Sequence, residues 1–355
     1  MKDENKKRGK VTRREFLGTT AAAAALSTVP FHIRCASAHR SMFGGVQMGA
    51  ITYSFRSMED QSATATLDYC IRAGLGTVEL MGTGIEAALG MPEGPPRPRL
   101  ERGVELTAVQ QAEYDAAVAE YEAALPAVQA EQREWRQTVG TPEKYAEIRK
   151  MFNDAGVDIH IYKWTAGNTE EELDYSFKVA KALGAVGITT EGPRQPGDES
   201  AYSMVQTMGS VAEQNGMYCI LHNHGQYHSM TIEDIEGILD LSPAVRLNFD
   251  CGHYFGYGYD STGEVDVIQF IEHFAGMGKI VSIHCKDKTG PNTDPPNQNQ
   301  VWGQGETPLA EVLLLVKNKY PNIYCDIELE YSIPAWSDPV KEVRNCINWA
   351  RQVLI

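Results

Sequence analysis

The residues best suited to chemistry are histidines and carboxylates that directly follow short apolar runs. Five successive runs end in this way, with Glu191, with His222 and His224, with Asp250 and His253, with His284 and Lys286, and with Glu328 and Glu330. Burying so many ionisable groups together is costly unless a cation balances them. Imidazole and carboxylate without a thiolate suit Zn²⁺, Mn²⁺ or a related ion. The pattern therefore predicts a site for one divalent metal ion.

Taken singly, each of these residues has a plainer explanation. One carboxylate after an apolar run usually caps a turn, and one histidine there is usually a hydrogen-bonded core residue. The seven cysteines include no CxxC pair, so a thiolate zinc site is not indicated. Cys219, Cys251, Cys285 and Cys325 fall in predicted strands and are interpreted as core thiols, with oxidation of a pair after export as the alternative.

The elements that must position these residues alternate regularly. A short apolar strand is followed by a polar loop and a helix, which is typical of a parallel sheet. The predicted strands span residues 47–54, 77–80, 157–162, 186–190, 217–221, 245–249, 279–283 and 323–327. The predicted helices span 62–73, 170–183, 200–215, 232–241, 265–274, 309–320 and 339–354. Eight such units within residues 46–355 predict the α/β class and a (β/α)₈ TIM barrel, in which strand ends converge on one pocket.

One stretch, residues 83–140, breaks this rhythm between the second strand and its helix. It begins with a proline-rich segment and continues as a helical run, 106–135, that Pro126 is expected to interrupt. No heptad persists, which argues against a coiled coil. The stretch is predicted to be a helical insertion after strand 2. It either packs as a hairpin on the rim of the barrel or forms a lid over the pocket.

The first 38 residues resemble a targeting segment rather than part of the folded domain. Arg13-Arg14-Glu15-Phe16-Leu17 is followed by an Ala-rich apolar run and by Ala36-Ser37-Ala38, a small-residue cleavage site. This order resembles a twin-arginine export signal and predicts a periplasmic or otherwise exported protein. The alternative is a basic N-terminus with a chance arginine pair. The apolar run is too short to span a membrane, so no stable membrane anchor is expected.

The charge of the chain limits the class of partner. The formal net charge is −15, and residues 1–38 contain eight Lys/Arg against three Asp/Glu, so the remainder carries about −20. Such a body repels phosphate backbones, which argues against nucleic-acid binding. A neutral small-molecule sugar is a better-matched partner. A homo-oligomer is compatible with the sequence, which does not define the oligomeric state.

Several motifs together resemble the xylose isomerase-like TIM barrels, in particular the sugar phosphate isomerase/epimerase family. The matching pieces, which lie within residues 46–350, are His222-Asn-His224, Asp250-Cys-Gly-His253, His284-Cys-Lys286-Asp287, Trp302-Gly303-Gln-Gly305-Glu306 and Glu328-Leu-Glu330-Tyr. The resemblance implies one divalent ion held by residues of strands five to eight. Asp250, His284 and Glu328 match three ligand positions, and His222 takes the place of a glutamate that also moves protons in the epimerases.

The resemblance also implies roles for the neighbouring side chains. Proton abstraction next to a carbonyl would use Glu328 or Glu191 as the base, and His253 falls where the family places a substrate-binding histidine. Lys286 and His224 are expected to contact substrate oxygens, and Trp302 to stack on a sugar face. Trp164 is a further candidate for stacking, Lys163 could serve the pocket, and barrel packing or solvation are the alternatives for these residues.

Three reactions share this machinery. Returning the proton elsewhere gives isomerisation or epimerisation, the reaction that the resemblance favours. Loss of a β-substituent gives a lyase acting on 3-keto-glycosides or related sugars, and attack by hydroxide gives hydrolysis. A non-catalytic carbohydrate-binding protein is the alternative from another class, and it would bind no metal.

Overall fold

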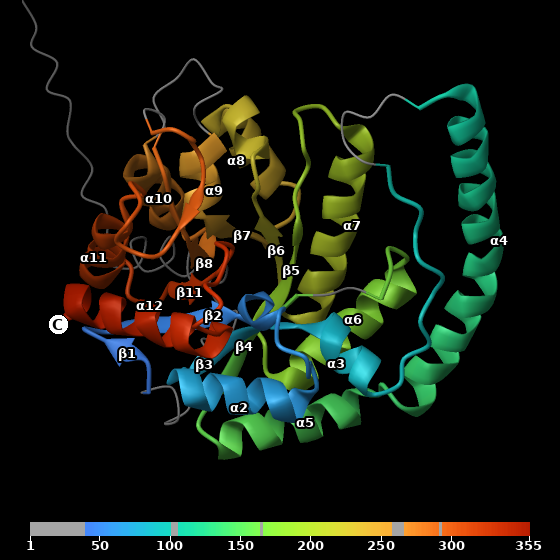
Figure 1. Ribbon diagram of the computed structural model, residues 1–355, viewed down its shortest axis with the longest axis horizontal. Coiled ribbons are helices and arrows are strands. Elements are labelled where there is room, and N and C mark those ends of the chain that lie inside the picture. The colour runs from blue at the N-terminus through green and yellow to red at the C-terminus, as the bar shows by residue number, and fades with distance from the viewer. Residues whose placement is uncertain (1–39, 101–105, 164–165, 258–265, 291–292) are drawn as a thin grey trace, which may run out of the picture. The chain divides into compact units, whose positions relative to one another are not determined.

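The computed structural model describes residues 40–100, 106–163, 166–257, 266–290 and 293–355. Within them, eight parallel strands close into a barrel, because the sheet order β2-β11-β8-β7-β6-β5-β4-β3 is completed by pairing of β3 with β2 (Figure 1). The strands of the barrel are β2 (Val46–Ile51), β3 (Thr77–Met81), β4 (Asp158–Lys163), β5 (Gly187–Glu191), β6 (Tyr218–His222), β7 (Val245–Asp250), β8 (Ile280–Cys285) and β11 (Tyr324–Ile327). This confirms the predicted (β/α)₈ barrel and all eight predicted strands.

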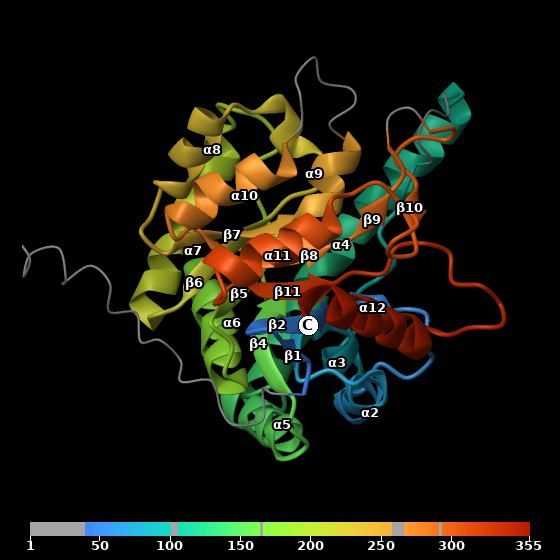
Figure 2. The same ribbon diagram turned by 90° about the vertical axis from the view of Figure 1, so that its left-hand side faces the viewer.

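The principal helices lie around the barrel strands, as two views at right angles show (Figures 1 and 2). They are α2 (Ala63–Ala73), α5 (Pro142–Asp154), α6 (Glu170–Leu183), α7 (Glu199–Asn215), α8 (Ile232–Leu239), α10 (Val267–Gly276), α11 (Leu309–Lys319) and α12 (Pro339–Leu354). Side-chain caps begin most of them; Thr169, for example, accepts the backbone N–H of Glu172. Gly184 and Gly216 end α6 and α7 in the left-handed conformation, which glycine adopts readily, and the chain then turns back to a strand.

Smaller elements complete the chain. Two-residue strands form two antiparallel pairs: β1 (Met42–Phe43) pairs with the beginning of β2, and β9 (Asp287–Lys288) pairs with β10 (Asn299–Gln300). Short helical turns follow three barrel strands, η3 (Thr52–Phe55), η4 (Gln226–Ser229) and α9 (Cys251–Tyr257). Among the described residues, no helix is both long and apolar enough to cross a membrane.

The middle of the barrel is polar. The Asp326 Oδ2 atom lies 2.9 Å from Nε2 of His160, whose Nδ1 lies 2.8 Å from the Thr77 hydroxyl oxygen. All three side chains are buried. Gly49 leaves the room that Asp326 needs, since a Cβ atom on this glycine would lie 2.2 Å from Asp326 Oδ1. The barrel is therefore filled in part by hydrogen-bonded polar groups rather than by aliphatic side chains alone.

The insertion after strand two consists of a short helix, an extended segment and one long helix. The helices are α3 (Gly82–Ala88) and α4 (Ala108–Thr138), and α5 then returns the chain to the barrel. The expected interruption at Pro126 is wrong, because α4 continues through it. Loss of one backbone donor is tolerated in a helix of this length, because its remaining hydrogen bonds continue on both sides. Whether the insertion acts as a lid stays a prediction.

The long helix packs against the extended segment rather than against a second long helix. Its half-buried side chains include Tyr114, Val118, Tyr121, Leu125, Val128 and Gln132, at alternating spacings of four and three. The Gln132 amide donates to the carbonyl of Pro92 at 2.9 Å, and the Trp135 indole donates to that of Leu89 at 3.3 Å. Figure 1 shows the segment running beside α4. These six positions keep a heptad-like spacing, which differs from the expectation that no heptad persists. The face is covered by extended chain rather than by a second helix, so this spacing does not signify a coiled coil.

A buried carboxylate fastens the insertion to the barrel wall. Glu86 of α3 accepts hydrogen bonds from the hydroxyls of Tyr145 on α5, at 2.9 Å, and Tyr162 on β4, at 3.1 Å. Burial raises the pKa of Glu86 from 4.5 to about 7, although both tyrosines oppose the shift. The protonated form is thus favoured by folding.

This shift predicts a pH-dependent contribution to stability. Because the folded protein holds the Glu86 proton more tightly, the stabilisation is complete below about pH 4.5 and is lost as the pH rises through about 7. Relative to a Glu86→Gln variant, we expect the wild type to lose about 2–3 kcal/mol of unfolding free energy between these limits. Urea denaturation of both proteins at pH 5 and pH 8 measures the difference. An equal pH dependence in the two would contradict it.

The six described cysteines are buried and free, and they include the four that were interpreted as core thiols, Cys219, Cys251, Cys285 and Cys325. None forms a disulfide within the part of the chain that the structure describes. Residues 1–38 and Trp164 lie outside the described residues, so the export signal and the stacking role of Trp164 stay predictions.

Candidate metal centre

Parallel pairing brings the candidate ligands to one end of the barrel. Asp250 at the end of β7 lies beside His284 of β8. His222 ends β6, and Glu328 directly follows β11. The side chain of Glu328 is the most exposed of the four, at 7%, so water has little access to any of them. Adjacent strand ends thus deliver two imidazoles and two carboxylates to one buried place.

These four residues meet the first requirement of a metal site. One ligand atom from each of His222, Asp250, His284 and Glu328 lies within 4.8 Å of the others. The buried Asp250 Oδ2 atom has the Lys286 ammonium as a charged neighbour at 3.0 Å, so this oxygen is already held by a positive charge. The donor set contains no thiolate and suits a divalent ion such as Zn²⁺ or Mn²⁺. These residues therefore fit the predicted cation.

His284 is held between two carboxylates. Its Nδ1 lies 2.9 Å from Glu328 Oε2, and its Nε2 lies 2.7 Å from Glu79 Oε2. Burial alone would lower the pKa of His284, but Glu79 and Glu328 together raise it well above its usual value. Burial would raise the pKa of Glu328, yet Lys286 and His284 hold it well below the usual range. In the ion-free protein, the cluster is therefore an ion-pair network.

Lys286 supplies a positive charge within this cluster. Its ammonium nitrogen lies 3.0 Å from Asp250 Oδ2, 3.2 Å from Glu328 Oε2 and 2.7 Å from Glu330 Oε2. Burial opposes the charged form, but these carboxylates raise the pKa of Lys286 above its usual value. The ammonium thus contacts two of the four candidate ligands, and it balances their charge in the ion-free protein.

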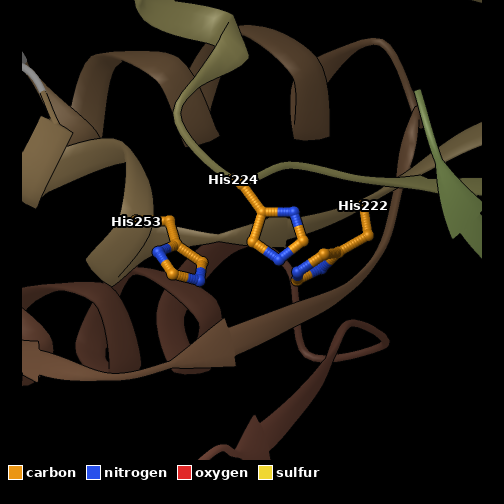
Figure 3. Close-up of side chains that lie close together, drawn as sticks. All are labelled: His222, His224 and His253. Carbon is orange, nitrogen blue, oxygen red and sulfur yellow. The ribbon is translucent and has the colours of Figure 1, made fainter. Parts of the chain in front are cut away.

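Three histidines lie close together beside the candidate ligands, and one of them, His222, is itself a candidate ligand. His224 lies between His222 and His253 (Figure 3), with ring centroids 5.0 Å and 4.8 Å from theirs. His253 receives its position from Asp250, whose Oδ1 accepts the backbone N–H of His253 at 2.7 Å. Burial, and then the charge of Lys286, lower the pKa of His253 to about 2. His253 is therefore a neutral imidazole at the edge of the cluster.

The remaining predicted site residues lie at different depths. The side chain of Glu191 is 44% exposed and pairs with Arg194 at 3.1 Å, and its Oε1 lies 3.5 Å from His224 Nδ1. The side chain of Glu191 thus contacts His224, which itself lies outside the group of four candidate ligands. Lys163 is half-buried, and its charge lowers the pKa of His222 after the larger effect of burial. Lys163 therefore acts electrostatically on one candidate ligand, and its role in the pocket stays a prediction.

Trp302 lies in the core of the barrel wall. It is 5% exposed and packs edge-to-face on Trp349 of α12, with ring centroids 5.6 Å apart. Its loop is fastened by Asp287, whose Oδ2 accepts the backbone N–H groups of Gly303 and Gly305 at 2.8 and 3.0 Å. Packing accounts for Trp302, and its contact with a sugar stays a prediction.

Replacing Trp302 should therefore affect stability. A Trp302→Phe change leaves a gap against Trp349 and is expected to cost about 1–2 kcal/mol of unfolding free energy. Trp336 is 80% exposed, so Trp336→Phe is the matched control and should change stability by less than about 0.5 kcal/mol. Urea denaturation measures both. Equal effects at the two positions would contradict the buried role of Trp302.

Two buried residues beside the ligands were not assigned a role from the sequence. Glu79 ends a predicted strand, but it stands alone there. Asn248 precedes Asp250 by two residues, and this spacing places both on the same face of β7. That spacing was a usable signal for Asn248. The contact of Glu79 with His284 joins β3 to β8 across the barrel, and no sequence spacing reveals it.

Comparison with known proteins gives a consistent family. The family model described as xylose isomerase-like TIM barrel matches residues 67–353. Among curated proteins, none matches this chain significantly. Solved structures that are similar include a sugar phosphate isomerase/epimerase from Parabacteroides distasonis, at 13% identity and a TM-score of 0.52, covering 87% of this chain and 95% of that one.

Two further structures resemble the chain to the same degree. The probable 3-DHS dehydratase of petrobactin synthesis from Bacillus anthracis has 13% identity and a TM-score of 0.54, covering 84% of this chain and 98% of that one. A xylose isomerase domain protein from Planctomyces limnophilus has 15% identity and a TM-score of 0.53, covering 81% and 91%. At these identities the likeness shows the fold alone.

Proposed function

Because the chain belongs to the xylose isomerase-like TIM barrel family, we propose that it is a divalent-metal-dependent enzyme that removes a proton next to the carbonyl of a sugar. The observation that carries this proposal is the buried group of His222, Asp250, His284 and Glu328, with Lys286 and His253 at its edge. The neighbours named as an isomerase/epimerase and a probable dehydratase belong to this range of reactions. Isomerisation or epimerisation is the first candidate outcome.

The four residues would hold Zn²⁺ or Mn²⁺, and the bound ion would polarise the carbonyl and the adjacent hydroxyl of the substrate. Glu328 is the proposed base, because its carboxylate belongs to the buried group and is the most exposed of the four side chains. Glu191 was the other candidate base, and its exposure and its pairing with Arg194 make it the weaker one. The ammonium of Lys286 and the imidazoles of His224 and His253 would donate hydrogen bonds to substrate oxygens.

Elimination is the second candidate, and the charge of Lys286 favours it. Epimerisation uses two proton-moving groups on opposite sides of one carbon, and His222 stands where a second carboxylate would serve. Elimination instead needs one base and one donor to the departing oxygen. Glu328 would be the base and Lys286 would be the donor, and their charged groups lie 3.2 Å apart. A 3-keto-glycoside or a related sugar would be the substrate of that reaction.

Two measurements test the proposal. Metal analysis of purified protein should give close to one equivalent of a divalent ion, and less than about 0.1 equivalent after incubation with Zn²⁺ and Mn²⁺ would overturn it. Incubation with unphosphorylated keto-sugars and 3-keto-glycosides in D₂O then separates the reactions. Deuterium in recovered sugar indicates isomerisation or epimerisation, whereas a released aglycone or a dehydrated product indicates elimination. A protein that binds no metal and leaves all these sugars unchanged would favour the non-catalytic carbohydrate-binding role.

A further inference from the structure

We infer that Glu79 and Asn248 are positioning residues that fix which ring nitrogen each candidate ligand histidine presents to the ion. This inference rests on the proposed metal centre. The two side chains come from β3 and β7, are fully buried, and lie outside the group of His222, Asp250, His284 and Glu328, although Glu79 also forms a second possible metal-holding group with His284 and Asp326.

Glu79 defines the protonation of His284. Its Oε2 atom lies 2.7 Å from His284 Nε2, and an ionised carboxylate can only accept hydrogen bonds. Nε2 must therefore carry a proton, which leaves Nδ1 as the nitrogen that faces Glu328 at 2.9 Å. A cation held with Glu328 would meet Nδ1, while the Nε2 proton stays with Glu79. This is the carboxylate–histidine–metal arrangement that orients ligands and increases their basicity.

Asn248 extends the same control to His222. Its Nδ2 lies 2.7 Å from Glu79 Oε2 and 3.0 Å from His284 Nε2. Because the carboxylate oxygen only accepts, Nδ2 donates to it, and Oδ1 is the atom that lies 3.2 Å from His222 Nδ1. An amide oxygen only accepts, and Nδ1 of His222 therefore carries the proton. His222 is left to offer Nε2 to the ion. One hydrogen-bonded chain thus joins both imidazoles through Asn248 and Glu79.

The remaining oxygen of Glu79 shows why this carboxylate is stable when buried. The Thr189 hydroxyl donates to Oε1 at 2.8 Å, so three donors from three other strands surround the group. A charged, rigidly held carboxylate is well suited to orient the ring of His284.

Substitutions at Glu79 separate its charge from its hydrogen bonds. In Glu79→Gln, the amide oxygen can still accept from His284 and Asn248, and the amide nitrogen can donate to Thr189, so only the charge is removed. Glu79→Met removes both the charge and the acceptor. Glu86→Gln is the matched control, because Glu86 is another buried carboxylate, but it accepts from Tyr145 and Tyr162 rather than from a histidine.

The first readout is affinity for Zn²⁺, measured by competition with a chromophoric chelator. We expect about tenfold weaker binding for Glu79→Gln and about 100-fold weaker binding for Glu79→Met, which is the range for such partners. Glu86→Gln should bind as the wild type does. Affinities within about twofold of the wild type for both Glu79 variants would overturn the inference. If Glu79→Met does not fold, the comparison of Glu79→Gln with Glu86→Gln decides.

The second readout is the imidazole NMR signals of His222 and His284, which a purely structural role would not alter. In the ion-free wild type, we expect a protected Nε2 proton on His284 and a protected Nδ1 proton on His222. The His284 signal should be lost in Glu79→Met and retained in Glu86→Gln. Because this measurement needs no ion, a protein that bound no metal would refute the proposed function while still testing the hydrogen-bonded chain. An unprotonated His284 Nε2 in the wild type would overturn the inference.

Discussion

A Lys286→Met variant is expected to lose about 3–5 kcal/mol of unfolding free energy in the ion-free protein, because it leaves buried carboxylates without their counter-charge. The ammonium is 2% exposed and lies within 3.2 Å of Asp250, Glu328 and Glu330. Methionine is similar in length but carries no charge. A divalent ion should replace that charge, so most of the loss should disappear when Zn²⁺ is added in excess.

Urea denaturation with chelator and with excess Zn²⁺ measures both parts of this prediction. Lys279→Met is the control, since Lys279 is partly buried but contacts the carbonyl of Leu239 and the exposed Asp240 instead of the centre. It should cost about 1 kcal/mol or less and show no rescue by the ion. A loss in Lys286→Met that is equal with and without Zn²⁺ would mean that the ion and the ammonium do not serve the same carboxylates.

The second large effect is expected at Glu328. A Glu328→Gln variant should lower the rate of deuterium incorporation, or of elimination, by about 10²–10⁴-fold, because a base is lost from the proton-transfer step. Zn²⁺ affinity should also fall, since one ligand loses its charge. Assays at saturating Zn²⁺ separate the two effects.

Glu330→Gln is the matched control for this change. Glu330 lies two residues further along and contacts the same Lys286 ammonium, but it is outside the ligand group. We expect its rate to fall by less than about tenfold. A Glu328→Gln protein that binds Zn²⁺ and retains the wild-type rate would assign the base to another residue.

The barrel and the gathering of the four candidate ligands at one end of it were predictable, because both depend on short-range patterns. Each strand is an apolar run of about the same length, and parallel pairing places its last residue at a common end. Asp250 and His284 therefore came together simply because their strands are neighbours. The four-residue group found in the structure is the one expected from the strand ends.

The features that the sequence did not reveal depend on contacts across the barrel, or on contacts of a segment that has no regular spacing of apolar residues. Glu79 meets His284 across the interior, and the partner of α4 is an extended segment whose composition predicts no regular element. Trp302 was expected at the sugar because aromatic rings favour such positions, but packing on Trp349 already accounts for its burial. Pro126 shows that a local helix breaker can be outweighed by the hydrogen bonds on either side of it.

The tight fit between Gly49 and Asp326 has a consequence for how relatives can diverge. A side chain at Gly49 would occupy the place of the Asp326 carboxylate oxygen. Removal of the carboxylate would leave His160 without this hydrogen-bond partner and would leave a cavity next to the glycine. Neither change is tolerable alone, so the three positions should be inherited as a set. Lineages that fill the glycine position should carry a smaller, uncharged residue opposite it and an apolar residue in place of His160.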